Sequence, residues 1–157
     1  MSSVLFSPFT MRSLTLPNRI VVSPMCQYMA DNGSASDWHL MHLGQFSIGA
    51  AGLIITEATH VSPIGRITPR CLGLYSDDNE STLKHVIDFC RRNGVAKLGI
   101  QLAHAGRKGS TLSPFEGGKS LKPEQGAWQT VAPSALPFGP DWHVPNALDA
   151  AGLAEVK

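Results

Sequence analysis

The sequence has little net charge and no long hydrophobic run. Its 157 residues carry a formal net charge of +1, and charged residues make up 16% of the chain. Such a balance gives no field strong enough to attract nucleic acid or an anionic membrane, so we expect neither as a partner. No apolar run approaches the ~20 residues that span a bilayer, and the first residues lack the charged start and apolar stretch of a secretion signal. We therefore expect a soluble, unprocessed protein.

Cysteine is scarce, and several common site motifs are missing. The three cysteines, Cys26, Cys71 and Cys90, are odd in number and scattered, so they form neither a disulfide framework nor a zinc-binding spacing. This usage fits a reducing cytoplasm. The chain has no glycine-rich phosphate fingerprint and no internal repeat. His39 and His42 have a spacing compatible with metal ligation, but no third ligand accompanies them, and we expect no metal site.

A short apolar run that ends in reactive side chains is the most informative feature that is present. The β-branched residues 20–22 favour a buried strand, which Pro24 ends because proline has no amide hydrogen. The strand then opens into Ser23, Pro24, Met25, Cys26, Gln27 and Tyr28. From this segment alone, ordinary packing of Met25 and Cys26 is an equally good interpretation.

Strand and helix patterns alternate along the chain. A small hairpin is expected within residues 5–16, and Asp37 is expected to cap a helix over residues 38–50. On that helix, one side would be made of Trp38, Met41, His42, Gln45, Phe46 and Gly49. Further strands are predicted at 53–58 and 97–102, and a second helix from Asp77 or Asp78 to residue 93. Cys71 and Cys90 are expected to be core or surface residues without a function. Such alternation is typical of right-handed βαβ units with a parallel sheet. Residues 109–145 are predicted to form a long loop, and residues 146–157 to begin another helix.

Each predicted strand ends in a polar cluster of similar character. The clusters are residues 23–28, residues 57–60 and residues 101–108. Because the carboxyl ends of parallel strands meet at one edge of a sheet, these clusters would line one pocket rim. The repetition favours a functional site over simple packing.

Three ordered motifs, SPMCQY, EATHVSPIGRIT and QLAHAGRK, carry a family resemblance. They resemble the N-terminal half of the old yellow enzyme family of FMN-dependent ene-reductases, and within it the bacterial branch that carries a cysteine over the flavin. The resemblance implies an α/β fold, the N-terminal portion of a (β/α)₈ TIM barrel with three βα units after a short hairpin. This chain alone would not close the barrel. Residues 1–157 would form part of one FMN-binding domain, with residues 109–145 as a loop over the carboxyl ends of the strands.

The resemblance also implies roles for individual residues. Ser23, Pro24, Met25 and Cys26 would flank the isoalloxazine ring, Ala58 would back onto its edge, and Gln101 would hydrogen-bond its pyrimidine side. Cys26 would tune the flavin as a weak donor rather than attack a substrate, and Tyr28 would contact the substrate. The implied cofactors are FMN and a hydride donor, NADPH or NADH. The implied substrate is an activated alkene, an α,β-unsaturated carbonyl or nitro compound.

Other polar residues have simpler expected roles. Glu57 could act as a general base, but we expect its carboxylate to be held by backbone amides or by Arg66. We expect His104 to shape the turn that follows the third strand. Arg107 and Lys108 are interpreted as a solvated basic pair.

Several parts of the implied enzyme are absent from the sequence. A closed barrel needs eight strands and about 250 residues. By the resemblance, the substrate-binding histidine pair, the proton-donating tyrosine and the arginines for the FMN phosphate follow later strands. The resemblance also implies a homo-oligomer when the protein is complete, or a complementing C-terminal chain. Two alternatives remain open: a non-catalytic barrel fragment or half-barrel, and a thiol hydrolase that uses Cys26 and His104.

Overall fold

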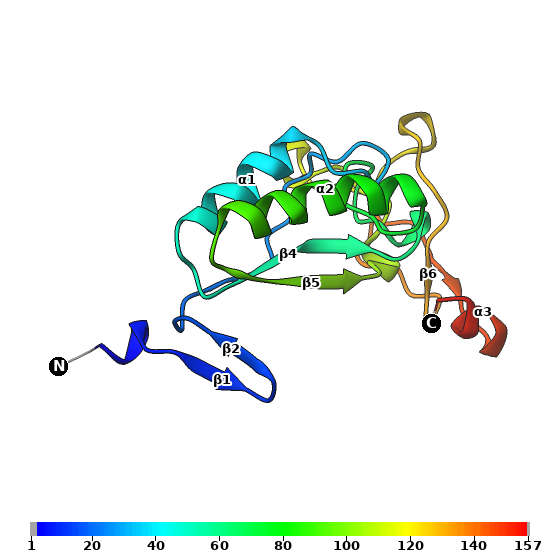
Figure 1. Cartoon of the computed structure of the whole chain (residues 1–157). Coiled ribbons are helices and arrows are strands. Elements are labelled where there is room, and N and C mark those ends of the chain that lie inside the picture. Colours follow the sequence, from blue (N-terminus) through cyan, green and yellow to red (C-terminus); the bar gives the residue numbers. More distant parts are fainter. Residues whose placement is uncertain (1–2, 157) are drawn as a thin grey trace.

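Three parallel strands form the central sheet of the protein. The computed structural model describes residues 3–156. Strands β3 (Val21–Val22), β4 (Leu53–His60) and β5 (Lys97–Ala103) lie in the order β3-β4-β5, and both pairs are parallel. The connecting helices α1 (Asp37–Ile48) and α2 (Asp77–Asn93) lie side by side over one face of this sheet (Figure 1). The predicted βαβ alternation is confirmed.

The remaining elements are short. They are the antiparallel hairpin β1 (Phe9–Met11) and β2 (Leu14–Leu16), the parallel pair β6 (Val131–Ala132) and β7 (Asn146–Ala147), helix α3 (Ala150–Val156), and single 3₁₀ turns at Val4–Phe6, Pro63–Gly65, Gly106–Lys108, Pro114–Glu116 and Pro123–Gln125. The N-terminal hairpin is therefore confirmed. The helix predicted from residue 146 instead begins at Ala150, because Asn146 and Ala147 pair with β6; Lys157 lies outside the described residues.

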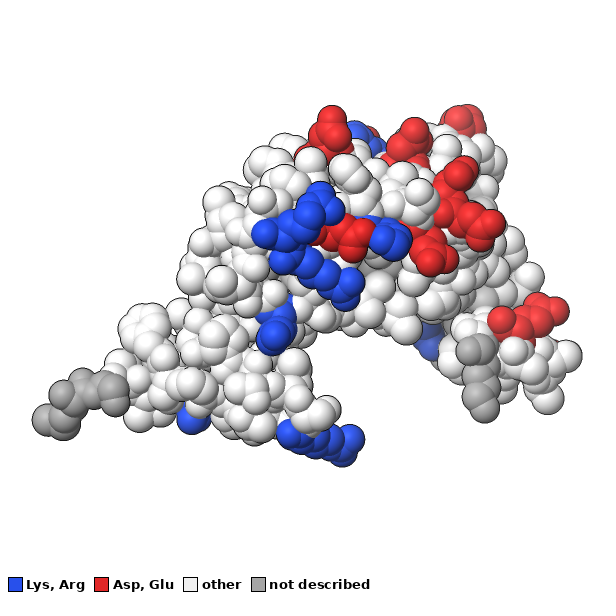
Figure 2. All heavy atoms as spheres, viewed as in Figure 1, with Lys and Arg blue, Asp and Glu red and all other residues white. Residues whose placement is uncertain are grey.

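Helix α2 has a capping residue at its N-terminus and charged residues in its first and last turns that favour the helix. The Ser76 hydroxyl accepts a hydrogen bond from the Asn79 amide at 3.2 Å, which satisfies one free donor of the first turn. Acidic side chains occupy the first turn and Arg91 and Arg92 the last, so both ends complement the helix dipole. Figure 2 shows red atoms gathered toward one end of the helix and blue atoms toward the other, with both colours side by side between them.

The buried face of helix α1 is made of small and polar residues together with one leucine. Its N-cap is Ser36 rather than Asp37, and its buried residues are His39, Leu43, Gly44 and Ser47. Trp38 and Met41, which the sequence groups on one side of the helix, are 41% and 49% exposed. Small and polar residues are buried because each has a partner: the Ser47 hydroxyl donates to the Cys90 carbonyl at 3.0 Å, and Gly44 admits the Phe89 ring.

The core lies between the two helices and the sheet. Its buried members are Leu43, Ala51, Ile54, Val86, Cys90 and Ala96. Cys71 is also fully buried, so of the two locations expected for Cys71 and Cys90, core or surface, the structure shows the core for both. No helix within residues 3–156 is long and apolar enough to cross a membrane.

A β-bulge interrupts the pairing of β4 with β5. Ile55 pairs with Gly99 and Ala58 with Gln101, so three steps along β4 match two along β5. Without the extra residue Glu57 would pair with Gln101; with it, Ala58 takes that place. The bulge therefore decides which β4 side chain stands beside Gln101.

Candidate functional site

The carboxyl ends of the three parallel strands bring the predicted clusters to one edge of the sheet (Figure 1). Residues 23–28 follow β3, and the ends of β4 and β5 lie beside them. Ala58 is buried and its register partner Gln101 is exposed. An exposed amide beside a small buried residue leaves room for a flat polar group against the strand ends.

Cys26 is half-buried at this edge. Burial is the main reason that the pKa of its thiol is raised to about 11; the nearby Cys71 and Glu57 act in the same direction, and the Ala58 backbone amide opposes the shift. A nucleophilic cysteine needs a lowered pKa. Cys26 is therefore a neutral thiol near pH 7, which argues against the thiol hydrolase alternative.

Tyr28 has an unusual backbone for a tyrosine. Its φ is +56°, in the left-handed region that side chains with a β-carbon avoid. Burial raises the pKa of its phenol to about 12, with smaller contributions from Cys26, Cys71 and Glu57. The ring meets the edge of Phe115 at a centroid distance of 6.1 Å. A residue of the long 109–145 segment thus reaches the predicted substrate contact.

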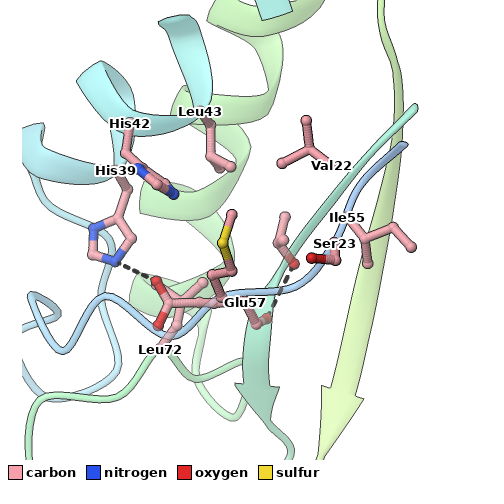
Figure 3. Close-up of a pocket in the computed structure, with 10 residues that line it drawn as sticks. Val22, Ser23, His39, His42, Leu43, Ile55, Glu57 and Leu72 are labelled. Carbon is pink, nitrogen blue, oxygen red and sulfur yellow. Dashed lines mark hydrogen bonds and ion pairs between the residues drawn. The ribbon is translucent and has the colours of Figure 1, made fainter. Parts of the chain in front are cut away.

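Glu57 is held between helix α1 and the loop that follows β3. One carboxylate oxygen accepts a hydrogen bond from the Gln27 backbone amide at 3.1 Å. The other lies 3.2 Å from His39 Nε2, and both side chains are almost completely buried. Figure 3 shows His39 and Glu57 pointing toward one another in the lining of a small pocket. The expected backbone-amide contact of Glu57 is found. The expected Arg66 contact is not, because that guanidinium donates to the carbonyls of Pro63 and Pro69.

The first turn of α1 also contacts this loop directly. Trp38 Nε1 donates to the Gln27 side-chain oxygen at 3.1 Å, and the Ser36 hydroxyl donates to the Met29 carbonyl at 2.9 Å. Sequence reasoning missed both contacts and treated His39 only as a weak metal ligand. The sequence offered only a weak signal for the role of His39: Ser36 and His39 have the spacing of a capping box, but a histidine stands where Glu or Gln is usual.

A buried histidine, His60, ends β4, and a half-buried one, His104, follows β5. Burial, together with the nearby His104 and Arg66, lowers the pKa of His60 to about 4. Burial also lowers the pKa of His104, whose Nδ1 accepts from the Gly106 amide at 3.2 Å. His104 therefore shapes the 3₁₀ turn at Gly106–Lys108, in line with its expected role.

The basic pair after β5 is not simply solvated. Arg107 donates to the Ser134 hydroxyl at 3.2 Å, and the Lys108 ammonium lies 5.7 Å from the centre of the Phe138 ring. Ser134 and Phe138 both belong to the 109–145 segment. Within residues 3–156 no three histidine, cysteine or acidic side chains gather in a way that could hold a metal ion.

Comparison with known proteins identifies similar chains. Residues 4–132 match the NADH:flavin oxidoreductase / NADH oxidase family. An NADPH dehydrogenase from a Geobacillus species is 41% identical over 157 residues, which are 99% of this chain and 42% of that protein. The solved structure of morphinone reductase in complex with tetrahydroNAD is 26% identical, with a TM-score of 0.80 over 99% of this chain and 43% of that one.

A third comparison bears on the fold alone. The structure of an old yellow enzyme from a Pichia species is 23% identical, with a TM-score of 0.80 over 97% of this chain and 39% of that one. The chain spans about two fifths of the length of the curated relatives that it matches. The open sheet corresponds to part of a (β/α)₈ barrel, as predicted.

Proposed function

The chain belongs to the NADH:flavin oxidoreductase / NADH oxidase family, and from that premise we propose that the full-length protein is an FMN-dependent oxidoreductase. It takes hydride from NADPH or NADH and delivers it to the β-carbon of an activated α,β-unsaturated carbonyl or nitro compound. The paired positions of Ala58 and Gln101 at the strand ends carry the proposal. FMN, when bound, supplies the hydride-transfer chemistry.

The residues at the strand ends fit a flat heteroaromatic ring. Gln101 is exposed and its amide can both donate and accept, which matches the mixed N–H and C=O edge of a flavin. Ala58 is small, so a ring can lie against the end of β4. Ser23, Pro24, Met25 and Cys26 would border the other side of that ring.

The thiol and the phenol of the loop are suited to donating hydrogen bonds rather than to covalent catalysis. Both stay protonated at neutral pH, since burial raises the pKa of Cys26 to about 11 and that of Tyr28 to about 12. Cys26 would contact the bound ring, and Tyr28 would orient the substrate above it. The Phe115 edge against Tyr28 supports a role for residues 109–145 in covering this site.

Flavin reduction by the full-length protein tests the proposed function. We expect the purified protein to be yellow, to lose its flavin absorbance with NADPH or NADH under anaerobic conditions, and to regain it when 2-cyclohexenone is added. Cyclohexanone should be the product. A protein that binds no FMN, or whose FMN never bleaches with either nucleotide, would overturn the proposal.

Gln101→Leu tests the proposed contact to the ring edge. The substitution keeps the side chain's size but removes its hydrogen-bonding groups, so we expect FMN to bind roughly tenfold more weakly. Fluorescence titration of FMN with the apoprotein measures this. Gln45→Leu makes the same chemical change on the exposed surface of α1 and should leave FMN affinity unchanged. Equal affinity in all three proteins would contradict the role given to Gln101.

A further inference from the structure

The hydrogen bonds of His39 determine which ring nitrogen carries the proton. The backbone amide of Ser36 donates to Nδ1 at 3.0 Å, so Nδ1 is an acceptor without a hydrogen. The neutral imidazole then carries its proton on Nε2. That nitrogen is buried and lies 3.2 Å from Glu57 Oε1, without the alignment of a full hydrogen bond and with no other partner among the described residues.

The bulge in β4 explains why Glu57 meets this nitrogen. The extra residue on β4 gives Ala58 the position beside Gln101 and leaves Glu57 facing helix α1. The second carboxylate oxygen is then free to accept the Gln27 amide at 3.1 Å. His39, Glu57 and the Gln27 backbone therefore form one connected, buried chain of polar contacts.

The loop segment held by this chain contains a strained residue. Tyr28 has a φ of +56°, a strained conformation that persists only where the surroundings fix it. The fixed points lie on both sides of it, at the Gln27 amide and at the Met29 carbonyl. Cys26 immediately precedes the first of these points.

We infer that His39 is a positioning residue: it holds the Glu57 carboxylate against the Gln27 amide and thereby fixes Cys26 and Tyr28 at the strand ends. His39 touches neither residue itself and acts through Glu57. The importance of this positioning for catalysis rests on the proposed flavin function. The positioning itself can be measured without flavin.

Two substitutions of His39 separate its two contacts. Asparagine places its side-chain oxygen near the position of Nδ1, so His39→Asn keeps the acceptor for Ser36 and loses the donor to Glu57. Glutamine places its amide nitrogen near the position of Nε2, so His39→Gln keeps the donor to Glu57 and loses the acceptor for Ser36. The readout is alkylation of Cys26 by iodoacetamide in the full-length protein without FMN, mapped by mass spectrometry.

We expect His39→Asn to raise the alkylation rate of Cys26 severalfold, with about tenfold as the upper limit, because the close contact of Nε2 with Glu57 is weaker than a well-aligned hydrogen bond to a charged group. His39→Gln should change it less than twofold. Cys71 and Cys90 are fully buried, so their protection reports on the fold as a whole and should not change. Equal effects of the two variants on Cys26, or parallel exposure of Cys71 and Cys90, would overturn the inference.

Glu57→Gln provides a second route if His39→Asn does not fold. It weakens the same anchor and removes a negative charge that raises the Cys26 pKa, so Cys26 alkylation should rise and its pH profile should move to lower pH. An unchanged Cys26 rate would overturn the inference. Adding FMN to the wild-type protein tests the proposed function separately, because bound FMN should protect Cys26 from alkylation. Lack of protection would count against the flavin pocket. The comparison of the His39 variants would remain valid.

Discussion

The Cys26 thiol lies half-buried beside the Ala58 amide and the Tyr28 phenol, where burial raises its pKa to about 11. The same residue type in a polar, electropositive setting would be a nucleophile. Here the neighbouring Glu57 carboxylate reinforces the effect of burial. From its residue type alone, Cys26 could be either a nucleophile or a neutral hydrogen-bond donor. Its surroundings favour the neutral thiol as a donor.

His60 gives a prediction for the pH dependence of stability. Its folded-state pKa of about 4 lies below its ordinary value of 6.5, mainly because of burial. A group with a lowered pKa contributes stability above its unfolded pKa, and that contribution is lost as the pH falls from 6.5 toward 4. Between pH 7 and pH 5 this loss amounts to about 2 kcal/mol. We expect His60→Gln, which does not titrate, to remove this part of the acid sensitivity.

Urea unfolding of the full-length protein at pH 7 and pH 5 measures the effect. His85→Gln is the matched control, because it makes the same substitution on the exposed face of α2 and should leave the pH dependence unchanged. Identical acid sensitivity in the wild-type and His60→Gln proteins would show that His60 is not the responsible group.

At the scale of the elements, the contact between α1 and α2 depends on close approach of backbone. A β-carbon on Gly94 would lie 1.9 Å from the Ser47 hydroxyl and 2.6 Å from the Ser47 carbonyl oxygen, so α2 could not end where it does. A β-carbon on Gly44 would meet only the Phe89 ring edge, at 3.1 Å. The two glycines therefore differ in what a single methyl group would displace.

We expect Gly94→Ala to destabilise the protein by about 1–3 kcal/mol, because the backbone of Ser47 must move. Gly44→Ala is expected to be neutral or slightly stabilising, because a ring edge shifts easily and alanine favours the helix by up to about 1 kcal/mol. The free energy of unfolding from urea titration gives both values. Equal effects of the two substitutions would mean that the α1–α2 contact is looser than the structure indicates.

At the scale of the whole molecule, the described chain leaves apolar surface uncovered on the edge strand β5. Ile100 is 42% exposed and Leu102 60% exposed, and on its outer side β5 has no strand partner within residues 3–156. A barrel would cover both the edge and these side chains, as in the structures that this chain resembles over about two fifths of their length.

A polypeptide limited to residues 1–157 is therefore expected to associate and to bind a hydrophobic dye such as ANS. Replacing Ile100 and Leu102 with lysine should reduce both effects several-fold. Val95→Lys, at a residue that is 62% exposed before β5 begins, is the control and should change neither. Sedimentation and dye fluorescence provide the measurements. A monomer that unfolds sharply and binds no dye would contradict this expectation and the half-barrel alternative.

The order of strands and helices could be read from the sequence because it depends on local patterns. The strand predicted at 53–58 begins with the apolar run Leu53-Ile54-Ile55, and α2 has its N-cap next to its first turn and its charges within its own turns. The polar clusters at the strand ends were visible for the same reason. The family resemblance rested on these same segments, and the match over residues 4–132 confirms it.

Only the tertiary structure decided how these segments meet. The bulge in β4 shifts the register of β4 against β5 by one residue. This shift places Ala58 rather than Glu57 beside Gln101. The buried face of α1 follows from partners elsewhere in the chain: Glu57 for His39 and the Cys90 carbonyl for Ser47. Local hydrophobic periodicity carries no information about such partners, because burial of a polar side chain depends on a distant atom that satisfies it.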